Sequence, residues 1–193
     1  GQSPDCHWDK TNPYNLPGHS RMTAAEGCYY FGIPNVCRVK MGGEPKPPYD
    51  QESEAMRSCK KVVWSLLGAC GEPVTDTGDM YEVIRQAKIY DNIIGGVFDD
   101  FYTPVRTNHF TPEKLAEIKR EMCKKAGREL ELWSVAYEWL LTYDGIPNVK
   151  EIMNEFDVIT FWTWDAKNLR DAEKNIAEIS SWAKGKRIMA GCY

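Results

Sequence analysis

Several sequence features that define other classes of protein are missing from this chain. Its 193 residues carry a formal net charge of −4, and without an excess of Lys and Arg to neutralise phosphates we expect no nucleic-acid partner. No apolar run approaches the ~18 residues that a transmembrane helix needs, so we expect no membrane span. The phosphate-binding patterns G-x-G-x-x-G and G-x-x-x-x-G-K-[ST] are absent, and we predict no nucleotide or other cofactor. A G-x-S-x-G nucleophile elbow is absent as well.

The spacings typical of metal sites are also missing. The three histidines form no H-x-H or H-E-x-x-H pattern, so we predict no metal site. The seven cysteines are an odd number without a C-x-x-C pair, which disfavours a disulfide framework. Cys28, Cys59 and Cys123 fall in expected helices, and Cys37 and Cys192 fall in expected strands. We therefore interpret these cysteines as buried free thiols.

The length and the first residues of the chain indicate how it is organised. A length of 193 residues suffices for one domain with a substantial core, and no shift in composition divides the chain into two. We expect a single domain over residues 1–193. The polar opening Gly-Gln-Ser-Pro suits a mature chain whose leader has been removed, which favours a secreted or periplasmic protein.

Short apolar runs alternate with helical patterns along the chain, an order typical of parallel strands joined by crossover helices. Caps support the helix boundaries: Thr111 suits an N-cap, Pro112 suits the first turn and Gly127 suits the C-terminal end. The pattern predicts strands at residues 36–41, 61–68, 93–98, 130–137, 157–164 and 187–193. It predicts helices at residues 23–33, 51–59, 79–90, 111–126, 148–156 and 168–184.

The order of these elements predicts a parallel (β/α) barrel of the TIM type. If residues 5–9 are the tail of an earlier strand, the chain holds about seven strands. A complete eightfold barrel usually needs about 250 residues, so we expect an incomplete or clipped barrel that lacks its last βα unit. Two loops rich in Pro and Gly, at residues 10–21 and 42–50, follow expected strands and would lie on the face where such barrels bind substrates.

Acidic residues stand where two of the expected strands end. Asp99 and Asp100 follow one strand directly, and Glu138 follows the next. Adjacent carboxylates at a buried strand end repel each other and lose solvation, which raises at least one pKa and suits a general acid. The alternatives are that an aspartate caps a loop or pairs with Arg106, and that Glu138 points to solvent. We predict Asp99, Asp100 and Glu138 as catalytic residues.

Aromatic and charged residues near strand ends indicate a sugar site. Six of the seven tryptophans lie in or beside expected strands, and the flat apolar face of a pyranose stacks on such rings, although rings of this size also fill cores. Arg38 and Lys40 share a strand face, and because bare charges beneath helices are expensive, we expect both to line the barrel interior or its mouth. Pairing with Asp9 and Glu72 is the alternative for these two. The predicted substrate-binding residues are His7, Trp8, Asp9, Arg38, Lys40, Trp64, Tyr137, Trp162, Trp164 and Asp165.

At Gly95-Gly-Val-Phe-Asp-Asp-Phe101, Phe161-Trp-Thr-Trp-Asp165 and Gly191-Cys-Tyr193, the chain resembles TIM-barrel glycoside hydrolases and their bacterial relatives. At the fourth strand it loosely resembles chitinase-like enzymes, whose acids follow a Gly and apolar residues. The resemblance implies acidic strand-end roles for Asp99 and Asp100. The chain departs from that signature because Phe101 and Tyr102 follow the pair where a Glu is expected, so the substrate-assisted mechanism does not carry over.

The sequence therefore favours a glycoside hydrolase that acts on a poly- or oligosaccharide. In this hypothesis Asp100 or Asp99 protonates the leaving oxygen, Glu138 or the other Asp assists, and Trp164 and Tyr137 form sugar platforms. One alternative is a carbohydrate-binding barrel without catalysis. The other is a metal-dependent sugar isomerase or lyase, in which histidines would join Asp9 or Asp100.

Overall fold

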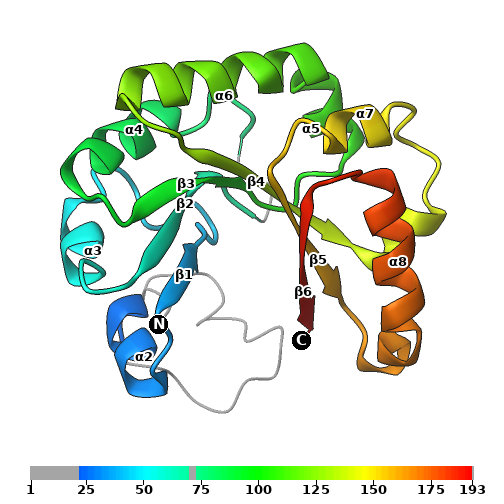
Figure 1. The fold of residues 1–193 in the computed structure, drawn as a ribbon, viewed down its shortest axis with the longest axis horizontal. Coiled ribbons are helices and arrows are strands. Elements are labelled where there is room, and N and C mark those ends of the chain that lie inside the picture. The colour runs from blue at the N-terminus through cyan, green and yellow to red at the C-terminus, as the bar shows by residue number, and fades with distance from the viewer. Residues whose placement is uncertain (1–21, 70–72, 193) are drawn as a thin grey trace.

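A computed structural model describes residues 22–69 and 73–192 of the chain. Six strands pair in the order β1-β2-β3-β4-β5-β6, and every neighbouring pair runs parallel. The sheet curls into a half barrel, with helices along its outer, convex side (Figure 1). The α/β class and the parallel order are as expected, but the described residues form an open half barrel and not a closed barrel. The strand expected at residues 5–9 lies outside the described residues.

The elements follow one another as crossover units. The strands are β1 (Asn35–Arg38), β2 (Lys61–Leu67), β3 (Ile93–Phe98), β4 (Glu131–Tyr137), β5 (Val158–Thr163) and β6 (Arg187–Cys192). The α-helices are α2 (Ala24–Phe31), α3 (Asp50–Ala55), α4 (Met80–Ile89), α5 (Pro104–His109), α6 (Pro112–Ala126), α7 (Val149–Met153) and α8 (Ala172–Trp182). Two 3₁₀ helices, η1 (Glu138–Thr142) and η2 (Ala166–Asp171), follow β4 and β5.

Most predicted elements are confirmed, and the differences have local causes. Strand β1 ends earlier than expected because Met41 forms a bridge with Glu44 across a turn in which Gly42 and Gly43 have positive φ. Helix α5 was not expected, although it begins at Thr103 and Pro104, the same Thr-Pro start that predicts α6. Helix α6 itself begins at its Thr111 N-cap and ends at a left-handed Gly127, as predicted.

Glycine allows strand β3 to approach its neighbours closely. A Cβ atom on Gly95 would lie 2.1 Å from the carbonyl oxygen of Glu131 in β4. A Cβ atom on Gly96 would lie 2.5 Å from the side chain of Leu66 in β2. No side chain fits at either distance, so the Gly-Gly pair sets the spacing at the middle of the sheet.

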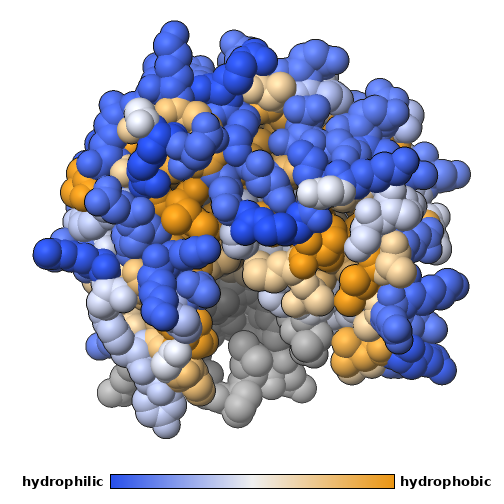
Figure 2. All heavy atoms as spheres, viewed as in Figure 1, coloured by the Kyte–Doolittle hydropathy of each residue, from blue (hydrophilic) through white to orange (hydrophobic). Residues whose placement is uncertain are grey.

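Two apolar clusters lie on opposite faces of the sheet. The larger cluster lies between the strands and the outer helices, and includes Trp64, Phe98 and Phe161. The smaller cluster lies on the concave face around Val63 and Val97. Figure 2 shows that the helical outer layer is mostly hydrophilic, with apolar residues gathered near the centre of the view. Within the described residues, every helix is too short or too polar to cross a bilayer.

The cysteines differ in their surroundings. Cys59 is buried as expected, and Cys28 and Cys123 are half-buried. The prediction of a buried thiol is wrong for Cys37, which is exposed. Residues alternate between the faces of a strand, and in β1 the helix-facing side is occupied by Val36, so Cys37 faces the concave side.

Candidate functional site

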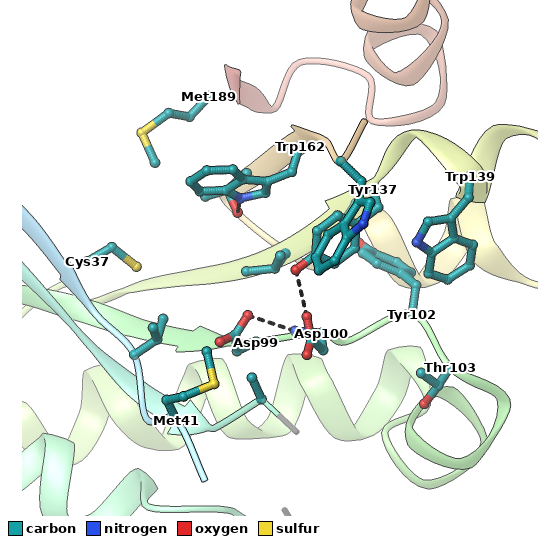
Figure 3. A pocket seen from close by; sticks show the side chains of 16 residues that line it. Cys37, Met41, Asp99, Asp100, Tyr102, Thr103, Tyr137, Trp139, Trp162 and Met189 are labelled. Carbon is teal, nitrogen blue, oxygen red and sulfur yellow. Dashed lines mark hydrogen bonds between the residues drawn. The ribbon is translucent and has the colours of Figure 1, made fainter. Parts of the chain in front are cut away.

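The concave side of the sheet encloses a cavity of about 770 Å³, hereafter the hollow. Cys37 of β1 and Met189 of β6 both line it, so the two ends of the curved sheet face the same space (Figure 3). The hollow extends to the carboxyl ends of β3, β4 and β5, where Asp99, Tyr137 and Trp164 line it. In parallel α/β sheets this is the edge at which ligands bind.

Asp99 and Asp100 lie together in the wall of the hollow. The backbone N–H of Asp99 continues the sheet by donating to the carbonyl of Leu67 at 2.9 Å, and only 6% of the residue is exposed. The backbone N–H of Asp100 donates to Oδ1 of Asp99 at 2.9 Å. The hydroxyl of Tyr137 donates to Oδ1 of Asp100 at 2.7 Å (Figure 3). The pair predicted from sequence is therefore aimed at the cavity and held by hydrogen bonds.

Arg106 fixes the backbone beneath this pair. Its guanidinium is buried and donates to the carbonyl oxygens of Asp99, of Asp100 at 3.1 Å and of Gly68 at 2.8 Å. Sequence alone left open an ion pair between Arg106 and an aspartate, and these contacts go to main-chain oxygens. Arg106 thus joins the ends of β2 and β3 and places one positive charge behind the two carboxylates.

Aromatic rings form one wall of the hollow. Tyr137 stacks on Trp139 with centroids 6.4 Å apart and packs edge-on against Trp164 at 5.7 Å. Trp139 and Trp164 are 43% and 49% exposed, so each presents a ring face or edge to solvent. Trp162 lines the same cavity, where its indole N–H donates to the hydroxyl of Thr160 at 3.1 Å. We call Tyr137, Trp139, Trp162 and Trp164 the aromatic wall.

Glu138 does not share the orientation of the aspartate pair. Both of its carboxylate oxygens accept the backbone N–H of Trp164 at 2.9 Å. The carboxylate also accepts from the Asn168 side chain at 3.2 Å and the Asp165 backbone at 3.4 Å. It lies outside the residues that line the hollow. This arrangement does not support the prediction of a catalytic Glu138, because the oxygens of its carboxylate accept hydrogen bonds from the loop after β5.

Two more predicted binding residues are engaged away from the hollow. Trp64 is fully buried, stacks on Tyr49 at 4.2 Å and donates to Ser53 at 3.1 Å. It belongs to the helix-facing core, so its predicted substrate contact is wrong. Asp165 caps η2 by accepting from the backbone of Lys167 at 3.0 Å, and its ion pair with that side chain lowers the pKa of the carboxyl.

Arg38 and Lys40 share a strand face as predicted, but it is the helix-facing one. Arg38 donates to both oxygens of Glu52 in α3, at 2.5 and 2.9 Å. Lys40 is buried and forms an ion pair with Asp79 before α4. The expectation that both line the interior is wrong, because neighbouring helices supply a carboxylate to each buried charge.

His7, Trp8 and Asp9 lie outside the described residues. Among the residues that are described, the sequence predictions omit Trp139, Thr160 and Met189, all of which line the hollow. Thr160 could have been found, since it lies two residues before Trp162 and shares its face. Trp139 offers no such signal, because it follows the strand in a 3₁₀ turn whose direction depends on tertiary contacts.

Two side chains that line the hollow, Cys37 and Tyr102, have raised pKa values. Cys37 is exposed to the hollow, but protein surrounds it on the concave side. Desolvation by the surrounding protein raises the pKa of its thiol to about 12, and the negative charge of Asp99 contributes to the increase. Burial also raises the pKa of Tyr102, against the effect of its hydrogen bond with Ser134. Neither side chain is a ready nucleophile at neutral pH.

Within residues 22–69 and 73–192, no group of three or more His, Cys, Asp or Glu side chains is arranged to hold a metal ion. No protein-family model, curated protein or solved structure matches this chain. Function must therefore be argued from the hollow itself.

Proposed function

We propose that this protein is a glycoside hydrolase that binds an oligosaccharide along the aromatic wall and cleaves it beside Asp99 and Asp100. The observation that carries the proposal is the placement of two adjacent strand-end carboxyls, one of them hydrogen-bonded by Tyr137, in a hollow lined by tryptophans. Aromatic rings bind the apolar faces of pyranoses, while carboxylates accept hydrogen bonds from their hydroxyls.

Glycosidases need two carboxyl groups beside the bond they break, one of which donates a proton to the leaving oxygen. Glu138 is excluded from the pair because its oxygens accept hydrogen bonds from Trp164 and Asn168. The two roles therefore fall to Asp99 and Asp100. In this proposal the more buried Asp99 donates the proton to the leaving oxygen, and the Asp100 carboxylate, oriented by Tyr137, takes a proton from the water that attacks the anomeric carbon.

The test is the separate replacement of each aspartate, Asp99→Asn and Asp100→Asn, with turnover measured on a panel of glycans. We expect each variant to lose turnover by roughly a hundredfold or more, the range typical of general acid–base groups. Asp144→Asn removes an exposed acid that does not line the hollow and serves as the matched control. Thermal unfolding of all three variants reports whether the fold is intact. Full turnover in both aspartate variants would refute the assignment.

A second candidate is a carbohydrate-binding protein without catalysis. The sequestered carboxylate of Glu138 favours it, because only the adjacent aspartates remain to act on a bond. Glycan binding without release of a shorter sugar, at every pH tested, would support this candidate over the hydrolase.

A further inference from the structure

The charged residues that the structure describes in the lining of the hollow are all acidic. Among the described residues that line it, two are acidic, Asp99 and Asp100, and none is Lys, Arg or His. Asp100 is the acid that a ligand would reach, because the residue is only half-buried and one of its carboxylate oxygens accepts from Tyr137. A ligand that enters the hollow therefore meets a carboxylate and no described cation.

Three cations on or beside the surrounding strands are paired with carboxylates. Arg38 and Lys40 lie on the helix-facing side of the sheet, each with its own carboxylate. Arg187 forms an ion pair with Glu131 at 2.7 Å, at the amino ends of β6 and β4. Arg106 balances one negative charge from behind the aspartate pair. Counted over the described residues alone, the part of the hollow beside the aromatic wall has a net negative charge.

The aromatic wall adds a second attraction for positive charge. The face of an indole ring is negative, and an ammonium group within about 6 Å of the ring centre is attracted to it. Trp139 and Trp164 are both close to half exposed and both line the hollow with Asp100. An ammonium group between these rings and the carboxylate would gain from both.

The backbone of Asp100 has a conformation that is uncommon for a residue with a side chain. Its φ of +43° is the one positive value among the described non-glycine residues. Residues in such conformations gather at functional sites, where surrounding contacts hold them in place. Arg106 and Tyr137 supply those contacts here, on the carbonyl and the carboxylate respectively.

We propose that the hollow selects a carbohydrate that carries a protonated amino group. The choice of a sugar as ligand rests on the proposed function. The choice of an ammonium group rests on the charge of the hollow. A neutral sugar gains stacking on the aromatic wall and hydrogen bonds from its hydroxyls to the carboxylates. A uronic or sulfated sugar is repelled by Asp100, and a sugar with an ammonium group gains an ion pair and cation–π contact.

The test compares binding of three tetrasaccharides by calorimetry, in slightly acidic buffer of low salt: glucosamine, N-acetylglucosamine and galacturonic acid. We expect the glucosamine tetramer to bind about tenfold more tightly than its N-acetylated counterpart, with the galacturonic acid tetramer weakest. Asp100→Asn should reduce the difference between the first two, because only the cation–π contact remains. Asp144→Asn should preserve it. Higher salt should reduce the preference, because the attraction is screened.

Binding of choline, a quaternary ammonium without a sugar, distinguishes the two proposals. Tight choline binding with no binding of any tetramer would support the ammonium site and refute the carbohydrate function. Equal binding of glucosamine and N-acetylglucosamine tetramers, unaffected by Asp100→Asn, would overturn the charge selection and leave the carbohydrate function standing. Tightest binding of the galacturonic acid tetramer would overturn the charge selection as well. Product formation, followed by mass spectrometry in the same samples, reports hydrolysis independently of binding.

Discussion

Asp100 shows how a single residue can serve a site at the expense of its own conformation. A left-handed backbone costs an L residue roughly 1–2 kcal/mol, and aspartate is among the few that adopt it. The φ of +43° turns the chain sharply after β3, so that Asp99 and Asp100 both line the hollow. Two adjacent residues of a regular strand would point to opposite faces.

Cys37 provides a test of the environment on the concave face. Its thiol has a pKa raised from 9.0 to about 12, mainly by desolvation. Because the folded protein disfavours the thiolate, this group stabilises the fold below its ordinary pKa, and that contribution is lost as pH rises toward 12. We expect iodoacetamide to alkylate Cys37 in mildly alkaline buffer about a hundredfold more slowly in the folded protein than in the urea-unfolded chain.

Peptide mass spectrometry follows this one cysteine among the seven. Since Cys37 is exposed to the hollow, slow labelling reflects protonation rather than access, and its rate should still increase above the pH at which the unfolded chain reaches a plateau. Equal labelling rates in the two states would contradict the raised pKa.

At the scale of elements, two side chains organise the carboxyl ends of four strands. Arg106 in α5 joins the ends of β2 and β3 through carbonyl oxygens. Glu138 in η1 joins the ends of β4 and β5 through N–H groups of Trp164 and Asp165. Helix α5 is the next element of the chain after β3, and η1 is the next element after β4. The carboxyl edge of the sheet is thus held by polar contacts that come from its own loops.

Glu138→Ala tests whether this contact orders the loop that carries Trp164. The carboxylate accepts from two backbone N–H groups, and loss of such charged hydrogen bonds costs about 1–3 kcal/mol. We expect amide hydrogen exchange at residues 164–168 to accelerate about tenfold or more, while exchange in β2 and β3 stays unchanged. Glu151→Ala changes an exposed glutamate on α7 and should leave the loop as it was. Unchanged exchange in Glu138→Ala would show that other contacts hold the loop.

At the scale of the whole molecule, charged residues connect the outer helices. Glu82 in α4 accepts from the backbone of Tyr49 at 2.8 Å, from Gln86 at 2.8 Å and from Arg85 at 2.9 Å. Arg85 also pairs with Asp50 at the start of α3. Burial opposes ionisation of Glu82, yet its hydrogen bonds prevail and lower the pKa of its carboxyl. The pKa of Asp50 is lowered mainly by its hydrogen bond from Arg85.

These two shifts predict that acid weakens the fold. A carboxyl with a lowered folded pKa contributes stability above its unfolded value, near 4, and loses that contribution as pH falls through the folded value. We expect the melting temperature to fall with pH in this acidic range, and to fall less steeply in Glu82→Gln than in the unaltered protein. Parallel curves for the two proteins would show that Glu82 does not contribute.

The sequence by itself determined the order of elements and the strand-end position of the aspartate pair. Apolar runs separated by capped helices leave parallel crossover pairing as the main solution, and the strands from β2 to β6 lie within a residue of their predicted ends. Asp99 and Asp100 follow β3 directly, so their place at the carboxyl edge follows from the strand assignment alone.

Only the tertiary structure decided which way the other polar and aromatic residues face. Alternation predicts that Arg38 and Lys40 share a face, but it does not say which one. Both residues face the helices, where they form ion pairs with the carboxylates of Glu52 and Asp79 from later parts of the chain. Glu138 likewise found its partners 26 and 27 residues further along the chain. Contacts over such separations depend on how the sheet curls, and no local pattern encodes them.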